Sequence, residues 1–474
     1  MKKLIFIVVL SITAFACNDF LEVEPRDILG IDQVFRNEND FYVALNGAYN
    51  NMLTSGYYGG QFMTIADASS DNGMIPIDAE TVRNPHFYNL LLNPINSTLL
   101  FWDTGYETIA SANNVLAALD GIDMSESSRQ RIRGEALFIR AMVHFDLSRV
   151  FGQDYNFTAD HSNLSAIIVT ATEIAEPPRN TVGEVYDFVM SDLNEAITLL
   201  TDNERPQNID TRFIASSNAA IALRSRIYLY MGDFTAALVD ANQIIDGGNY
   251  ELAPYVINDL NGDPNLTQID SWSSRTPTSE SILEGEADEL DGGYPGINGL
   301  AGLYQKAAGN AVFGPSLDII NLYAADDVRR NWYVQDAGVW HVNKYPGQGG
   351  LPLQFTAPMI RLTEMHLIAA ECHARLGDEA AALTNINLIR SRANQADFTS
   401  SGNQLLEDIL EERRRELAFE GHRFFDLKRT QQDIVRNDCS LSENCVVTYG
   451  DRLFAYPIPQ EEIDGNNSIV QEGY

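Results

Sequence analysis

Two stretches of the chain repeat the same alternation of apolar, small and polar residues at helical spacing. The first is 219–245, AAIALRSRIYLYMGDFTAALVDANQII, and the second is 364–390, EMHLIAAECHARLGDEAAALTNINLIR. A Gly-Asp pair interrupts each pattern, at Gly232-Asp233 and Gly377-Asp378. Glycine ends a helix in the left-handed conformation and aspartate caps the next helix, so each stretch predicts a helical hairpin.

The same pattern predicts more helices elsewhere in the chain. The two hairpins resemble tetratricopeptide repeats, in which small residues allow close helix approach. A third pair is expected at 106–119 and 131–150, where alanine and large apolar residues recur at helical spacing. A helix at 182–200 should open on a Thr181-x-x-Glu184 capping box and pack against the 219–245 hairpin.

The C-terminal part predicts one more helix, at 404–420. Within it, Glu411 and Arg415 stand four residues apart, a spacing that favours an ion pair. Two long stretches between the hairpins, 54–94 and 251–358, are rich in Gly, Pro, Asn and Asp but also in Tyr and Trp. Long loops in a compact domain are usually functional or form a packed irregular unit, so we expect one of these two roles for each segment.

The N-terminus predicts export and lipidation. Lys2 and Lys3 precede an apolar run of about ten residues, too short to span a bilayer, which needs about 20. The run ends in Ala14-Phe15-Ala16-Cys17, which is typical of a bacterial lipobox. Residues 1–16 are therefore interpreted as a signal peptide, and Cys17 as the lipidation site that anchors the chain to a membrane. The alternative is an ordinary signal peptide with an incidental cysteine.

The other three cysteines predict no metal site. Cys372 lies in a strongly helical stretch and is expected to be a buried thiol. Cys439 and Cys445 stand six apart in a loop-like stretch, and an exported protein meets oxidising conditions. We therefore expect a local disulfide between them, in preference to two free thiols.

The charge balance narrows the possible partners. The chain has 66 Asp and Glu against 32 Lys and Arg, a net charge of −34. An acidic surface repels phosphate backbones, so no nucleic acid partner is expected. The balance is compatible with a neutral ligand or a basic partner.

Motifs for catalysis and cofactors are missing from the sequence. HExxH, GxSxG and P-loop patterns do not occur, and we predict no catalytic residue, no cofactor and no metal. His366 and His373 flank Glu371 and Cys372 on one helix, but packing explains these positions better. Asp259 begins a calcium-like loop in which Pro264 replaces the required glycine, so a solvated turn is expected. Carboxylate pairs are so abundant that a glycosidase pair stays open.

Candidate ligand contacts are aromatic and polar residues of the two irregular segments. Carbohydrates pack their C–H faces on aromatic rings and hydrogen-bond to Asn, Asp, Gln or Arg. The candidates are Trp272, Tyr58, Tyr57, Asp67, Asn72, Arg275 and Tyr294, with Trp332 and Trp340 behind them. Trp272 and Tyr58 are favoured because serines or glycines beside them indicate exposure. For each aromatic the alternative is core packing, and Trp102, at a helix start, is assigned to the core.

Several segments together resemble the SusD/RagB family, in family order and over essentially the whole mature chain. The matching stretches are Cys17-Asn-Asp-Phe-Leu-Glu-Val-Glu-Pro25, Arg133-Gly-Glu-Ala-Leu-Phe-Ile-Arg-Ala141, Ile360-Arg-Leu-Thr-Glu-Met365 with Ala369-Ala-Glu371, Glu412-Arg-Arg-Arg-Glu-Leu-Ala-Phe-Glu-Gly421, Arg423-Phe-Phe-Asp-Leu-Lys-Arg429 and Tyr456-Pro-Ile-Pro459. The resemblance implies a mostly all-α, SusD-like fold over 17–474, built on four tetratricopeptide-like hairpins with irregular ligand-binding segments. The Arg/Glu motifs are expected to tie helices together, not to contact ligand.

The resemblance also implies a function. Such a protein is a lipoprotein on the outer face of the outer membrane that covers a SusC-like TonB-dependent transporter. It captures oligosaccharides, or peptides in some members, and performs no chemistry. Two other classes stay open from the residues: a surface glycoside hydrolase, and an interaction module that uses its hairpins as a platform.

Overall fold

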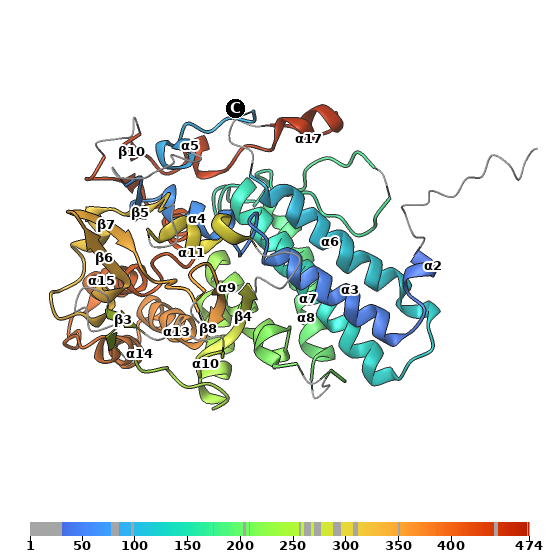
Figure 1. The fold of residues 1–474 in the computed structure, drawn as a ribbon, viewed down its shortest axis with the longest axis horizontal. Helices are drawn as coiled ribbons and strands as arrows, with labels where there is room; N and C mark the ends of the chain where they lie inside the picture. Colours follow the sequence, from blue (N-terminus) through green and yellow to red (C-terminus); the bar gives the residue numbers. More distant parts are fainter. Residues whose placement is uncertain are drawn as a thin grey trace, which may run out of the picture.

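Helices dominate the molecule, and its strands are short and paired two by two (Figure 1). The computed structural model describes residues 31–471 and 473, apart from 77–84, 96–98, 174, 202–204, 208, 256, 260–266, 270–275, 288–294, 307–310, 349–350 and 440–443. Across this described part, no helix has both the length and the apolar character needed to cross a membrane.

Within the part of the chain that the structure describes, nine long helices pack as one continuous array. Each helix contacts the next in chain order, although long segments separate some of them in the sequence. In Figure 1 the array runs from α3 and α6 on the right, through α9 and α10, to α14 and α15 on the left. Its members are α3 (Glu38–Met52), α6 (Phe101–Ala118), α7 (Glu126–Phe151), α8 (Val182–Leu199), α9 (Ser217–Met231), α10 (Phe234–Asp246), α13 (Leu362–Leu376), α14 (Glu379–Arg392) and α15 (Gly402–Glu416).

The two predicted hairpins are confirmed as α9–α10 and α13–α14. Gly232 and Gly377 end the first helix of each pair with φ of +80° and +86°, the left-handed conformation that favours glycine. Asp233 accepts a hydrogen bond from the amide of Ala236 at 3.0 Å, and Asp378 caps α14 in the same way. Because α10 packs on α13, the two hairpins are neighbours in space.

The other helix predictions are confirmed with one correction. α6 and α7 form the third pair, and Trp102 is buried at the start of α6. Thr181 and Glu184 form the reciprocal capping box of α8, which packs on α7 and also contacts α9. The C-terminal helix ends at Glu416 instead of residue 420, because the chain turns there and Phe419 adopts a φ of +63°.

Buried ion pairs join the C-terminal helices to the rest of the array, as the Arg/Glu motifs predict. The carboxylate of Glu416 accepts from Arg329 at 2.9 Å, from Arg361 at 3.0 Å and from Arg392 at 2.7 Å. Burial alone would raise the pKa of Glu416, but the three guanidinium groups outweigh it and hold this pKa far below its ordinary value. Charges that meet inside the fold therefore specify how α15 docks.

The remaining elements are short. Most belong to the two stretches predicted to be irregular, so these stretches are packed structure with small elements of their own. The helices are α2 (Ile31–Val34), α4 (Gln61–Ala68), α5 (Pro85–Asn89), α11 (Leu300–Tyr304), α12 (Leu317–Ile320), α16 (Arg423–Arg429) and α17 (Gln460–Gly465). The antiparallel strand pairs are β1 (Gly73–Met74) with β5 (Gly314–Pro315), β2 (Ile257–Asp259) with β3 (Thr267–Ile269), β4 (Ser281–Ala287) with β8 (Phe355–Arg361), β6 (Tyr333–Asp336) with β7 (Val339–Val342), and β9 (Ile434–Val435) with β10 (Val446–Val447).

Candidate functional site at the junction of the irregular segments

The two irregular segments meet beside the helical array, and we call their contact region the junction: residues 55–76 of the first and 296–306 and 311–316 of the second. β1 pairs with β5, so that Gly73 faces Pro315 and Met74 faces Gly314. The amide of Ser316 donates to the carbonyl oxygen of Asn72 at 2.7 Å. These backbone contacts align two segments that lie more than 200 residues apart in the chain.

A small cavity of about 170 Å³ opens at the junction. Its lining combines apolar side chains with hydroxyl and amide groups, a combination suited to a sugar ring with a C–H face and hydroxyl edges. The lining residues are Ser55, Gln61, Thr64, Phe87, Leu100, Asn298, Leu303, Val312 and Phe313. Small-molecule sites usually enclose about 300–1,000 Å³, so this cavity can accept one end or one ring of a longer ligand.

Hydrogen bonds hold the polar wall of the cavity in place. The side-chain oxygen of Gln61 accepts from the amide of Leu100 at 2.9 Å, and the Thr64 hydroxyl donates to the Gln61 carbonyl oxygen at 3.1 Å. Leu100, which lines the cavity, exposes 45% of its surface, and Ile297, which precedes the lining residue Asn298, exposes 43%. The site is therefore largely preformed and has an apolar rim.

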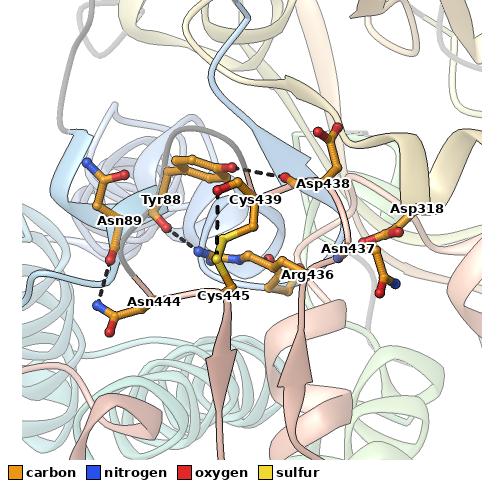
Figure 2. The surroundings of a disulfide bond; sticks show 10 residues. Tyr88, Asn89, Asp318, Arg436, Asn437, Asp438, Cys439, Asn444 and Cys445 are labelled. Atoms are coloured by element: carbon orange, nitrogen blue, oxygen red, sulfur yellow. Dashed lines mark hydrogen bonds between the residues drawn. A yellow bond between two sulfur atoms is a disulfide. The ribbon is translucent and has the colours of Figure 1, made fainter.

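A disulfide closes a hairpin against both irregular segments (Figure 2). Cys439 and Cys445 are bonded, which confirms the predicted pairing. The Asn444 side chain donates to the carbonyl oxygen of Asn89 at 2.9 Å, on the first segment. Asp438 accepts from the amide of Leu317 at 3.1 Å, on the second. This hairpin, formed by β9 and β10 and closed by the disulfide, thus contacts both segments next to the junction.

Tyr57 and Tyr58 lie in the core, so the expectation that Tyr58 is exposed is wrong. Both hydroxyl groups donate to the carboxylate of Asp146, at 2.6 and 3.0 Å, and both side chains are buried. The neighbouring glycines serve close packing, since a Cβ on Gly59 would stand 1.9 Å from a backbone oxygen and one on Gly60 would stand 2.5 Å from another. Glycine here marks a tight interior turn instead of a surface loop.

Asp67 and Asn72 are also buried and serve the structure. One carboxylate oxygen of Asp67 accepts from the Asn72 amide at 2.9 Å and from the backbone of Phe419 at 3.1 Å. Burial raises the pKa of Asp67 to about 6. Asn72 in turn accepts from Arg414 at 2.7 Å. Together they connect the first irregular segment to α15 and to the turn that follows it.

The other predicted contacts lie outside the described residues or do not line the junction cavity, although Trp340 lies on β7, which packs on β5. Trp272, Arg275 and Tyr294 are outside the described part of the chain, as are the lipidation site Cys17 and most of the calcium-like loop. Trp332 is buried, with the ammonium group of Lys344 3.8 Å from its ring centre. Trp340 is half-buried, and the Arg330 guanidinium lies 5.5 Å from its ring centre.

The two histidines considered for metal binding are held by neighbouring helices. His366 is buried and shares a hydrogen bond of 2.9 Å with Asn385, while His373 lies 3.6 Å from Asp378. Among the residues that the structure describes, no cluster of three His, Cys, Asp or Glu side chains could hold a metal ion. These positions belong to the packing between α13 and α14.

No motif or periodic pattern in the sequence indicates the residues that line the junction cavity. Gln61 and Thr64 lie on α4 within a stretch predicted to be irregular, while Asn298 and Phe313 come from the other segment. Only the pairing of two distant segments brings them together. Long-range backbone pairing of this kind leaves no periodic pattern in a single sequence.

Comparisons with known proteins agree on one family. Residues 19–229 match the family model described as "Starch-binding associating with outer membrane", and residues 353–474 match the model described as "SusD family". SusD-like protein P2 of Formosa agariphila is 26% identical over 90% of this chain and 91% of the relative.

Solved structures agree with the sequence matches. A SusD superfamily protein of Bacteroides vulgatus is 28% identical, with a TM-score of 0.80 over 93% of this chain and 100% of that one. A protein described as a "Laminarin binding SusD-like protein" is 22% identical, with a TM-score of 0.70 over 93% of this chain and 100% of that one. Both cover nearly the whole chain, so the fold is shared from end to end.

Proposed function

Because the chain belongs to the SusD/RagB family, we propose that it captures oligosaccharides at the junction and passes them to a SusC-like TonB-dependent transporter. The family description names starch binding and association with the outer membrane. One protein that shares this fold is described as laminarin binding. Both descriptions point to glucan-type ligands as the first class to test.

The junction cavity is the observation that carries the proposal. Its amide and hydroxyl groups can hydrogen-bond to sugar hydroxyls, and its phenylalanines and aliphatic side chains can pack on a ring face. Its volume suits one terminal ring, with the rest of an oligosaccharide lying across Leu100 and Ile297. Trp272, Arg275 and Tyr294, from the second irregular segment, are proposed as further contacts with that outer part.

We further propose that the protein binds without catalysis. Glycoside hydrolysis uses two carboxyl groups about 5–10 Å apart across the scissile bond. The nine residues that line the junction cavity include no Asp or Glu. A lipid on Cys17 would anchor the chain to the outer membrane and hold it above its transporter, with residues 17–474 forming the external domain.

Binding to a panel of glycans and peptides tests the proposal. The full chain in mild detergent would be run through affinity gels that contain starch, laminarin or charged polysaccharides, followed by calorimetry with oligosaccharides and peptides. Binding to one glycan without release of shorter products would support capture. Product release would indicate a hydrolase, peptide binding alone would indicate the alternative ligand class, and binding only to a transporter would indicate a platform.

Two variants locate the binding site. Ser55→Trp fills the cavity mouth and Asn298→Ala removes an amide from it, and both positions are at least partly exposed. Each should weaken glycan binding roughly tenfold or more while the melting temperature stays unchanged. Thr172→Ala, an exposed polar change far from the cavity in sequence and absent from its lining, is the control. Unchanged affinity in both cavity variants would place the glycan elsewhere.

A further inference from the structure

A larger cavity lies apart from the junction, between the start of α9, the chain after α10 and the residues before β4. We call it the polar groove; its volume is about 800 Å³, within the range of about 300–1,000 Å³ usual for ligand sites. It shares no lining residue with the junction cavity. The lining residues are Arg131, Leu200, Asp210, Thr211, Arg212, Ser216, Asn218, Gly248, Asn249, Tyr250, Glu251 and Ser279.

One wall of the polar groove is a fixed Asp–Arg pair. The Arg212 guanidinium donates to the two carboxylate oxygens of Asp210 at 2.9 and 2.5 Å. A third nitrogen donates to the carbonyl oxygens of Pro277 and Thr278 at 3.2 and 3.3 Å. The pair is half-buried and joins two separate parts of the chain, so its geometry is set before any ligand arrives.

The lining residues next to this pair are also held by hydrogen bonds within the protein. The Ser279 hydroxyl donates to the carbonyl oxygen of Glu251 at 3.0 Å, and the Glu251 amide donates to the carbonyl oxygen of Ser279 at 3.0 Å. The half-buried ring of Tyr250 also lines the groove. Burial raises the pKa of Tyr250, and the side chains of Asn218 and Ser216 partly oppose this rise.

The chemistry of these groups selects a class of ligand. An apolar ligand would remove water from many polar groups of the groove without replacing their hydrogen bonds. The lining has two arginines and two carboxylates, so its formal charges balance and favour neither an anion nor a cation. Hydroxyl-rich neutral molecules match the site, because a paired carboxylate and guanidinium can accept from and donate to hydroxyl groups. Asn249, exposed at the rim, adds a side-chain amide, and Tyr250 offers a ring for a C–H face.

We propose that the polar groove is a second binding site for neutral oligosaccharides, distinct from the junction. The proposal rests on the function proposed above, since it extends saccharide capture to a part of the helical array. Its larger volume accommodates more than one sugar ring, whereas the junction cavity accepts only one. The protein would then hold a saccharide at two independent places.

Hydrogen–deuterium exchange with defined sugars separates the two sites. Maltohexaose and laminarihexaose would be added to the full chain at saturating concentration, and protection would be mapped by peptide. The expected result is protection at 209–219 and 248–252 in addition to the junction peptides. Tyr250→Ala should abolish the groove protection, weaken the second calorimetric binding event roughly tenfold or more, and leave the junction protection intact.

Three further variants keep the test decisive. Tyr250→Phe retains the ring and should retain most of the binding, whereas Asn249→Ala changes an exposed side chain and should weaken it even if Tyr250→Ala fails to fold. Phe157→Ala, which removes a ring exposed at 39% beside Tyr449, is the matched control and should change nothing.

Each pattern of protection has its own meaning. Protection confined to the junction, with affinity unchanged in Tyr250→Ala and Asn249→Ala, would overturn the second site and leave the proposed function standing. Protection confined to the polar groove would support this site and overturn the junction. No protection with either sugar would overturn both.

Discussion

The helical array and the junction are held together by different kinds of contact. In the array, buried charges meet buried charges, as where Glu416 accepts from three arginines. At the junction, the two irregular segments meet through backbone hydrogen bonds, as where the Ser316 amide donates to the Asn72 carbonyl oxygen and β1 pairs with β5. The buried carboxylate of the junction, Asp71, pairs instead with Arg414 and Arg423 of the C-terminal helices. Contacts of the first kind require particular side chains, whereas backbone contacts tolerate many. A scaffold of this design keeps its shape while the residues around its cavity change.

The largest expected effect comes from breaking the charge cluster of the array. Glu416→Ala leaves three buried guanidinium groups without a shared carboxylate, which should reduce the free energy of unfolding by about 3–5 kcal/mol. Thermal and denaturant unfolding would measure this loss. Glu411→Ala, which removes an exposed partner of Arg415, should cost less than about 1 kcal/mol. Equal losses of unfolding free energy in both variants would contradict the expectation that the buried ion pairs contribute more than the exposed one.

Asp67 is a buried carboxylate that accepts hydrogen bonds from amides and not from arginines, so its behaviour should depend on pH. Its pKa of about 6 in the fold exceeds the ordinary value of 3.8, so the folded protein binds this proton more tightly. The corresponding stability is full below about pH 4 and is lost as the pH rises through 6. Asp67→Asn keeps a neutral side chain, so it should match the parent near pH 4 and exceed its unfolding free energy by about 2–3 kcal/mol above pH 7.

Melting curves from pH 4 to 8 would show whether Asp67 behaves in this way. The difference between variant and parent should grow with pH and level off above 7. A difference that does not depend on pH would mean that Asp67 is ionised in the fold throughout this range.

Removing the disulfide should loosen the junction and spare the array. The bond closes a loop of six residues in sequence separation, for which chain entropy predicts a loss of about 2 kcal/mol in Cys439→Ser with Cys445→Ser. Glycan affinity should fall with it, because the hairpin contacts both irregular segments. Circular dichroism should show the same helix content. Treating the unmodified protein with a reductant breaks the same bond without a substitution and serves as the matched experiment. If glycan affinity is unchanged in both cases, the disulfide does not contribute to the binding site.

The smallest expected effect comes from a helix cap in the array. Thr181→Ala removes the side chain that accepts from the Glu184 amide, which should cost about 1 kcal/mol. Glycan affinity should stay the same, since neither residue lines the junction cavity or the polar groove. A loss of affinity would show that the array and the binding surface are coupled.

The difference between local contacts and long-range backbone pairing decides what could be predicted from the sequence. The hairpins follow from local rules, because Gly232 and Asp233 act within a few residues of their positions. The disulfide could be predicted because its cysteines are close in the chain. The cavity could not, since Gln61 and Asn298 meet only through long-range pairing. The predicted exposure of Tyr58 is wrong because Gly59 is compatible with a surface turn and with a tight interior turn equally well.

The contact between α10 and α13 has a consequence for how the chain folds. Helices α3 to α10 contact mainly neighbours in the sequence, so this half can assemble as soon as it has been synthesised. The contact with α13 closes a segment of 115 residues, 247–361, which includes one side of the junction. Contacts between residues so distant form slowly. The α13–α14 hairpin should therefore dock on α10 last, and the binding surface should be completed in that final step.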